Sequence, residues 1–175
     1  MSGSLRIASL CLLLIAATTS PTGAEVTVRF VEPERHVDSG HFGRDRERNL
    51  RVLQGHLEQL GARCLAEGET LAIEVLDVDL AGRNEWWHRA GHDLRVMRAI
   101  TWPRLDVGYV WRDAAGTVLQ EGRERVTDMN YLQRSARMRF ETVPLPYERA
   151  MLRDWFARRF CRATGPDQIS RAVGR

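Results

Sequence analysis

Two aspartates near the end of one apolar stretch are the side chains that come closest to a chemical motif. Residues 71–82 are predicted to form a central strand, and Asp77 and Asp79 lie two residues apart on one of its faces. Carboxylate oxygens are the ligands that hard divalent cations prefer, so the pair is a candidate metal site. The alternative is structural, with Arg95 or Arg104 of a neighbouring strand neutralising the pair. The sequence favours the structural alternative because an isolated two-carboxylate motif is a weak signal.

Two histidines carry the other spacing that could bind a metal. His88 and His92 are four residues apart, which would place both imidazoles on one face of a helix in a zinc site. Gly91 and its polar surroundings argue against a helix, and no glutamate follows His88 to act as a base. Both are therefore interpreted as solvated loop histidines. No nucleophile motif is present either, so the sequence predicts no catalytic residue and no cofactor.

Aromatic and arginine residues gather in the segments that are predicted to be loops around the sheet. Such side chains are the usual anchors of binding interfaces. The alternative, which the sequence favours for the tryptophans, is that they close the core. The candidate binding residues are Trp86, Trp87, Trp102, Arg104 and Tyr131.

The beginning of the chain predicts export. Residues 6–24 start with one arginine, continue through an apolar run and end in small residues, which is the pattern of a signal peptide cleaved before Glu25. The run is too short to span a membrane, and no later stretch could serve as a transmembrane segment. We therefore expect an exported, periplasmic chain with a leader at 1–24, one domain at 25–162 and a disordered tail at 163–175.

Cys64 and Cys161 would remain after cleavage, each just past a predicted helix. An oxidising compartment permits a disulfide between them, and two buried thiols are the alternative. The sequence leaves these two states open. All 26 basic residues are arginines, the net charge is only +3, and acids alternate with them along the chain. The sequence therefore excludes a nucleic-acid partner.

The periodicity of apolar residues predicts an α+β domain. Its expected form is a mostly antiparallel sheet of four to five strands, with two main helices packed on one face. The first helix should end at Gly61, and the second should begin near Pro146. Segment 93–100 is ambiguous between strand and helix, with strand favoured. The expected strands are 26–31, 71–80, 105–111 and 118–127, the last two forming a hairpin whose charged return strand lies at a sheet edge.

Several separate blocks of the sequence resemble one protein family. These blocks are 77–82, 94–96, 102–104, 128–132 and 147–156, and the resemblance covers roughly 26–160. The chain resembles the bacterial exported domain-of-unknown-function family numbered 3016. The resemblance implies export but no activity and no site residue.

Two functions follow as hypotheses. The favoured one is a binding or accessory module of the bacterial cell envelope that recognises an envelope protein, a glycan or a lipid through its aromatic loops. The alternative is a metal-dependent hydrolase that uses Asp77 and Asp79.

Overall fold

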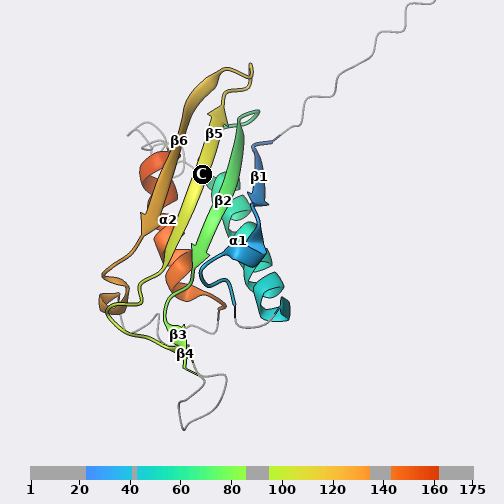
Figure 1. The fold of residues 1–175 in the computed structure, drawn as a ribbon. Coiled ribbons are helices and arrows are strands. Elements are labelled where there is room, and N and C mark those ends of the chain that lie inside the picture. Colours follow the sequence, from blue (N-terminus) through green and yellow to red (C-terminus); the bar gives the residue numbers. More distant parts are fainter. Residues whose placement is uncertain (1–22, 41–42, 86–94, 135–142, 162–175) are drawn as a thin grey trace, which may run out of the picture.

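The fold is built on a four-stranded sheet, which Figure 1 shows. The computed structural model describes residues 23–40, 43–85, 95–134 and 143–161. The strands lie in the order β1-β2-β5-β6, with β1 parallel to β2 and the other two pairs antiparallel. This arrangement confirms the predicted α+β class and the β5–β6 hairpin. The strands are β1 (Glu25–Phe30), β2 (Thr70–Asp79), β5 (Arg104–Arg112) and β6 (Val118–Thr127).

Two long helices accompany this sheet. The helices α1 (Gly43–Cys64) and α2 (Pro146–Arg159) supply side chains to the same buried cluster as the strands. A separate two-stranded sheet joins β3 (Arg83–Asn84) to β4 (Arg95–Val96), so the described part of the ambiguous segment 93–100 contains a short strand. Two 3-10 turns complete the described elements, η1 (Pro33–Arg35) and η2 (Tyr131–Gln133).

The core lies between the helices and alternate residues of the strands. Phe160, just past α2, packs edge-on against Trp111 and Trp155, with ring centroids 5.7 and 5.1 Å apart. On β2 the intervening residues Ala72 and Glu74 are exposed. β2 is central in the sheet, as predicted, and only one of its faces is buried along residues 71–75. The core includes Leu53, Leu57, Leu60, Leu71, Ile73, Val75, Leu105, Val107, Leu152 and Phe156.

A β-bulge in β2 changes which side chains share a face. The pairing with β5 shifts between Val75 and Asp77, leaving Leu76 as an extra residue. Because side chains alternate along a strand, the shift brings Val78 onto the buried face with Val75, and Asp77 moves to the opposite face. Uninterrupted alternation, which is all that the sequence offers, would put Asp77 and Asp79 on the face of Val75, and the bulge makes that placement wrong.

Gly61 lies inside α1 rather than at its end. A Cβ atom added there would come within 1.9 Å of Cγ2 of Val26 on β1. The glycine therefore allows the helix to approach the edge strand closely, and α1 continues for three more residues to Cys64. The prediction that Gly61 ends the helix is wrong because a glycine needed for close packing looks the same in sequence as one that stops a helix.

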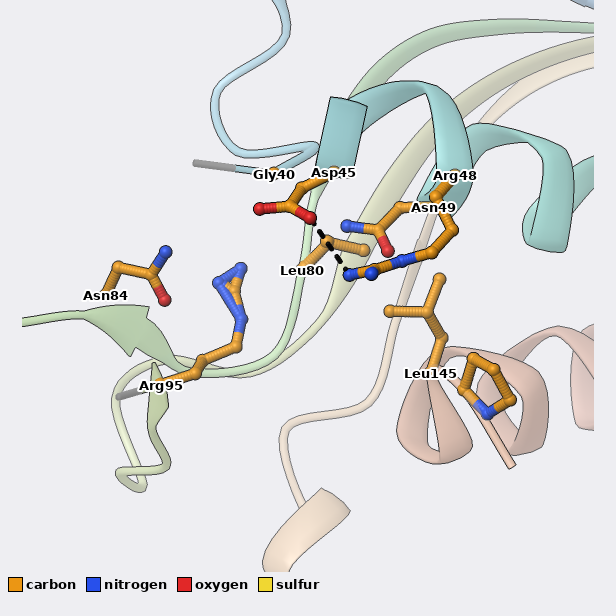
Figure 2. A pocket seen from close by; sticks show the side chains of 9 residues that line it. Gly40, Asp45, Arg48, Asn49, Leu80, Asn84, Arg95 and Leu145 are labelled. Atoms are coloured by element: carbon orange, nitrogen blue, oxygen red, sulfur yellow. Dashed lines mark ion pairs between the residues drawn. The ribbon is translucent and has the colours of Figure 1, made fainter. Parts of the chain in front are cut away.

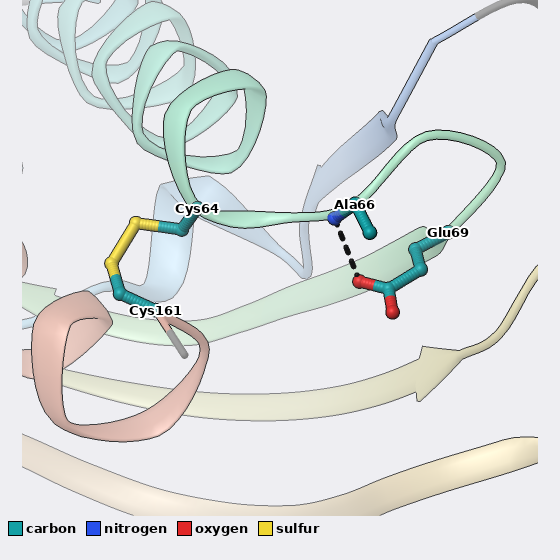
Figure 3. The surroundings of a disulfide bond; sticks show 4 residues. All are labelled: Cys64, Ala66, Glu69 and Cys161. Atoms are coloured by element: carbon teal, nitrogen blue, oxygen red, sulfur yellow. Dashed lines mark hydrogen bonds between the residues drawn. A yellow bond between two sulfur atoms is a disulfide. The ribbon is translucent and has the colours of Figure 1, made fainter. Parts of the chain in front are cut away.

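A disulfide joins the ends of the two helices, as Figure 3 shows. Cys64 is the last residue of α1, and Cys161 follows α2. The bridge closes a loop with a sequence separation of 97 residues. This confirms the disulfide as one of the two states that the sequence left open.

Within the described ranges, no helix is both long enough and apolar enough to cross a membrane. The segments 1–22 and 162–175 lie outside those ranges, so nearly all of the predicted leader and all of the predicted tail are not described.

Candidate functional site

The end of β2 carries a network of carboxylates and arginines. Asp79 is 4 % exposed and lies 2.7 Å from Nη2 of Arg104 and 3.0 Å from Nη1 of Arg83. Burial raises the pKa of Asp79, while the two arginines oppose this shift. Arg104 comes from β5, the neighbouring strand, so one of the two arginines expected to neutralise the aspartates does so.

Asp77 and Asp79 have different partners although they share a face. Oδ1 of Asp77 accepts a 2.8 Å hydrogen bond from the backbone N–H of Val37. The segment around Val37 runs beside β2, where the backbone N–H of Asp38 donates to Val78 and that of Leu80 donates to Asp38. Asp77 therefore fixes the path of this segment.

Arg95 binds a third aspartate rather than the predicted pair. Both of its terminal nitrogens donate to Oδ2 of Asp38, at 2.9 and 2.7 Å. Arg83 lies 3.5 Å from the same oxygen and so connects Asp38 with Asp79. The network thus ties β4, the segment after η1 and the end of β2 together.

Within the described ranges, Asp77 and Asp79 are not joined by further side chains into a metal site. Among those residues, no three His, Cys, Asp or Glu side chains form a group that could hold a metal ion. His88 and His92 lie in the segment 86–94, outside the described residues. Their role as metal ligands therefore stays untested.

The candidate binding residues are placed differently from one another. Trp86 and Trp87 lie outside the described residues, and Arg104 forms the ion pair with Asp79. Trp102 is half-buried against a small cluster that contains Tyr131. Tyr131 is fully buried, and its hydroxyl donates a 2.8 Å hydrogen bond to the backbone carbonyl of Arg98. The structure therefore brings Trp102 and Tyr131 together as packing partners.

A cavity of about 580 Å³ lies beside the carboxylate network, between the start of α1, the β3–β4 sheet and the start of α2. Figure 2 shows Asn84 and Arg95 on one side, Arg48, Asn49 and Leu145 on the other, and Leu80 between them. Nη2 of Arg48 lies 3.1 Å from Oδ1 of Asp45, which also lines the cavity. The walls combine amide and guanidinium donors with apolar surface, the mixture found in small-molecule sites.

A second cavity of about 320 Å³ shares Gly40 and Asn84 with the first. It is lined by Asp38 and Arg83 of the ionic network, and by His36. Nε2 of His36 lies 3.0 Å from the backbone carbonyl of Val31, which holds the imidazole against its own segment. The network therefore forms part of the walls of both cavities.

Sequence reasoning missed Glu148, which is buried in the first turn of α2 beside this region. Its Oε1 accepts a 2.7 Å hydrogen bond from the backbone N–H of Ala81. Burial raises the pKa of Glu148. A signal existed, because a glutamate two residues after Pro146 stands at the third position of the predicted helix, where carboxylates contact unpaired backbone N–H groups.

Sequence reasoning also missed Asp38, Arg48 and Asn49 as parts of the site. They belong to a predicted loop and to the first turns of a predicted helix, and no motif distinguishes them. Only the path of segment 36–40 along β2 brings Asp38 to Arg95.

Comparison with protein families identifies the class to which the chain belongs. It matches a family described as "Protein of unknown function (DUF3016)" over residues 24–158. The chain is a member of this family, which confirms the resemblance seen in the sequence. Searches of curated proteins and of solved structures found no match.

Proposed function

We propose that this protein is an exported binding module of the bacterial cell envelope, which works in the periplasm and binds a small carboxylate-bearing ligand. The observation that carries the proposal is the cavity of about 580 Å³ lined by Arg48, Asn49, Asn84 and Arg95 together with apolar side chains. Its volume falls within the range of about 300 to 1,000 Å³ that small-molecule sites occupy. The walls come from separate parts of the chain, so folding assembles the cavity.

The donors on the cavity walls indicate the chemistry of the ligand. A guanidinium carries five N–H donors, and it pairs with carboxylates in a planar, bidentate geometry. The ion pair of Arg48 with Asp45 uses one nitrogen of the Arg48 guanidinium. Asn84 adds an amide on the opposite wall, beside Arg95, while Leu80 and Leu145 provide apolar contact. A ligand with a carboxylate and an apolar portion matches this lining.

Export is supported by two features that are far apart in the sequence. The apolar leader at 6–24 has the order of charge, apolar run and small residues that signal peptidases recognise. The bridge between Cys64 and Cys161 is the chemistry of an oxidising compartment. Cell fractionation followed by N-terminal sequencing tests export directly, with Glu25 expected as the first residue of a periplasmic protein. A cytoplasmic protein that retains residues 1–24 would contradict it.

Titration calorimetry with envelope-derived ligands tests the binding site. Peptidoglycan peptides and uronic-acid oligosaccharides should bind, whereas the same peptides with amidated carboxyl groups and neutral oligosaccharides should bind at least about tenfold more weakly. Arg48→Gln should weaken binding by a similar factor. Arg51→Gln is the matched control, because Arg51 lies one turn further along α1, is 70 % exposed and does not line the cavity. Equal binding of charged and neutral ligands, or equal effects of the two substitutions, would refute the proposal.

A further inference from the structure

The edge strand β6 is long and its surroundings are open. It pairs with β5 on one side only, and within the described ranges no other strand pairs with its second side. Most of its ten residues are exposed. An open strand edge presents unpaired backbone N–H and C=O groups, which form a template for another strand.

The charges of β6 follow the alternation of the strand. Glu121 is paired with Val110 of β5, and Arg123 with Gly108, so both side chains lie on the exposed face of the sheet. In the described part of the chain, neither Glu121 nor Arg123 forms an ion pair or a side-chain hydrogen bond. Two unlike charges on either side of Gly122 are therefore available to a partner.

The inward side of the strand is already satisfied. Glu124 accepts hydrogen bonds from Tyr109 at 3.0 Å and from Trp155 at 3.1 Å, and Arg159 lies 2.8 Å from its carboxylate. This network fixes the edge strand against α2. It gives β6 a stable conformation before any partner arrives, which reduces the ordering cost of association.

We propose that two copies of this chain associate through their β6 strands, which pair antiparallel about Gly122 to make one continuous sheet. In this register Glu121 of one copy lies opposite Arg123 of the other, and the two-fold symmetry repeats the attraction. Two glycines meet at the axis, so no side chains collide there.

Charge selects this register over its neighbours. If the two-fold axis passed through Glu121 or through Arg123, that charged residue would lie opposite the same residue of the other copy. Like charges directly opposite each other are destabilising. Centring the axis on Glu124 would bring Arg123 opposite Arg125. Only the register about Gly122 pairs the unlike charges without opposing like ones. The same charges that discourage unspecific edge pairing therefore permit one symmetric dimer.

Sedimentation equilibrium of the purified chain across a range of concentrations tests this dimer. The unmodified protein should show a reversible monomer–dimer equilibrium that weakens at high salt, because exposed ion pairs are screened. The variants Glu121→Arg and Arg123→Glu should each lower the association constant at least about tenfold, since each places two like-charge pairs across the interface. The double variant, which swaps both charges, should restore association.

Two controls separate the register from a general effect of charge. Arg63→Glu and Glu67→Arg make the same changes at exposed positions outside β6, at the end of α1 and in the turn before β2. Circular dichroism and thermal melts show whether each variant is folded. The control variants should associate as the unmodified chain does. A chain that stays monomeric throughout, or a double variant that fails to restore association, would overturn the proposal.

Discussion

The carboxylate of Glu148 accepts a 2.7 Å hydrogen bond from the backbone N–H of Ala81, and both residues are buried. The bond connects the first turn of α2 with the chain just beyond β2. Its electrostatic surroundings include Arg95, which opposes the raised pKa of Glu148, and Asp38, which adds to it. This buried bond therefore lies within reach of the ionic network that lines both cavities.

Replacing Glu148 tests the structural value of this bond. Glu148→Ala leaves the buried N–H of Ala81 without its acceptor, which should cost about 1 to 3 kcal/mol of unfolding free energy. Glu148→Gln keeps a carbonyl oxygen for Ala81 and should lose less. Chemical denaturation at constant pH measures both. An alanine variant as stable as the unmodified protein would show that Glu148 contributes nothing to the fold.

The raised pKa of Glu148 predicts that the stability difference between Glu148→Gln and the unmodified protein depends on pH. Burial raises the pKa of Glu148 above its ordinary value of 4.5, so the folded state binds the proton more tightly than the unfolded state. Its contribution to stability is complete below 4.5 and is lost as the pH rises through the raised pKa. Because glutamine does not ionise, the stability of Glu148→Gln relative to the unmodified protein should improve as the pH rises from 4 to 8. A constant difference across this range would contradict the raised pKa.

Removing Arg104 should expose the cost of the buried carboxylate of Asp79. The pKa of Asp79 is already raised by burial, and Arg104 opposes this shift. Arg104→Met should raise the pKa further and destabilise the fold at pH 7 by about 1 to 3 kcal/mol. The loss of stability should become smaller as the pH falls, because protonated Asp79 carries no charge and no longer needs Arg104 to compensate it.

A double variant identifies the source of this loss. Asp79→Asn removes the charge that Arg104 compensates, so Arg104→Met should destabilise the Asp79→Asn protein less than it destabilises the unmodified one. Asp77→Asn is the comparison, since Asp77 accepts from a backbone N–H and its loss should not rescue Arg104→Met. Equal costs of Arg104→Met in all three backgrounds would show that the Arg104–Asp79 pair is energetically unimportant.

A histidine at the contact between the helices predicts sensitivity to acid. Nε2 of His56 on α1 lies 2.9 Å from the backbone carbonyl of Arg149 on α2. Burial lowers the pKa of His56, and the nearby charges of Arg149, Arg153 and Arg63 lower it further. The neutral ring, which donates its Nε2–H to that carbonyl, is therefore the form that fits.

The direction of the effect follows from the lowered pKa. As the pH falls below the ordinary value of 6.5, the unfolded chain takes up the proton first, so stability decreases until the pH passes the lowered pKa. His56→Gln keeps an N–H donor but cannot titrate in this range. Thermal melts at pH 7.5 and 5 should therefore show a smaller decrease for the glutamine variant. Equal decreases would assign the acid sensitivity to other groups.

Much of the fold was predictable because apolar periodicity reports directly on burial. The hairpin strands β5 and β6 and the start of α2 at Pro146 follow from local pattern and turn chemistry. Asp113 illustrates this, because its side chain accepts from the N–H groups of Ala115 and Thr117 and closes the predicted turn. These features depend on residues close together in the sequence.

The site was less predictable because it depends on contacts between distant segments. The bulge at Leu76 decides which face of the sheet Asp77 occupies, and no local sequence pattern predicts this bulge. The pairing of Arg95 with Asp38 spans 57 residues, whereas the sequence offered Asp77 and Asp79 as its partners. The expectation that Arg104 neutralises an aspartate was correct, because β5, which carries Arg104, lies next to β2, which carries Asp79.

The disulfide supplies a prediction that combines sequence separation with packing. Cys64 and Cys161 close a loop with a separation of 97 residues, for which the chain-entropy treatment gives about 4 to 5 kcal/mol as an upper value. The double variant Cys64→Ser, Cys161→Ser should therefore melt well below the unmodified protein, and reductant should lower the melting temperature of the unmodified protein alone. The single variants should resemble the double one, because each also lacks the bridge. Melting temperatures that do not respond to reductant would show that the bridge contributes little beyond the other contacts between α2 and the sheet, which include the packing of Phe160 against Trp111 and the bonds of Trp155 and Arg159 to Glu124.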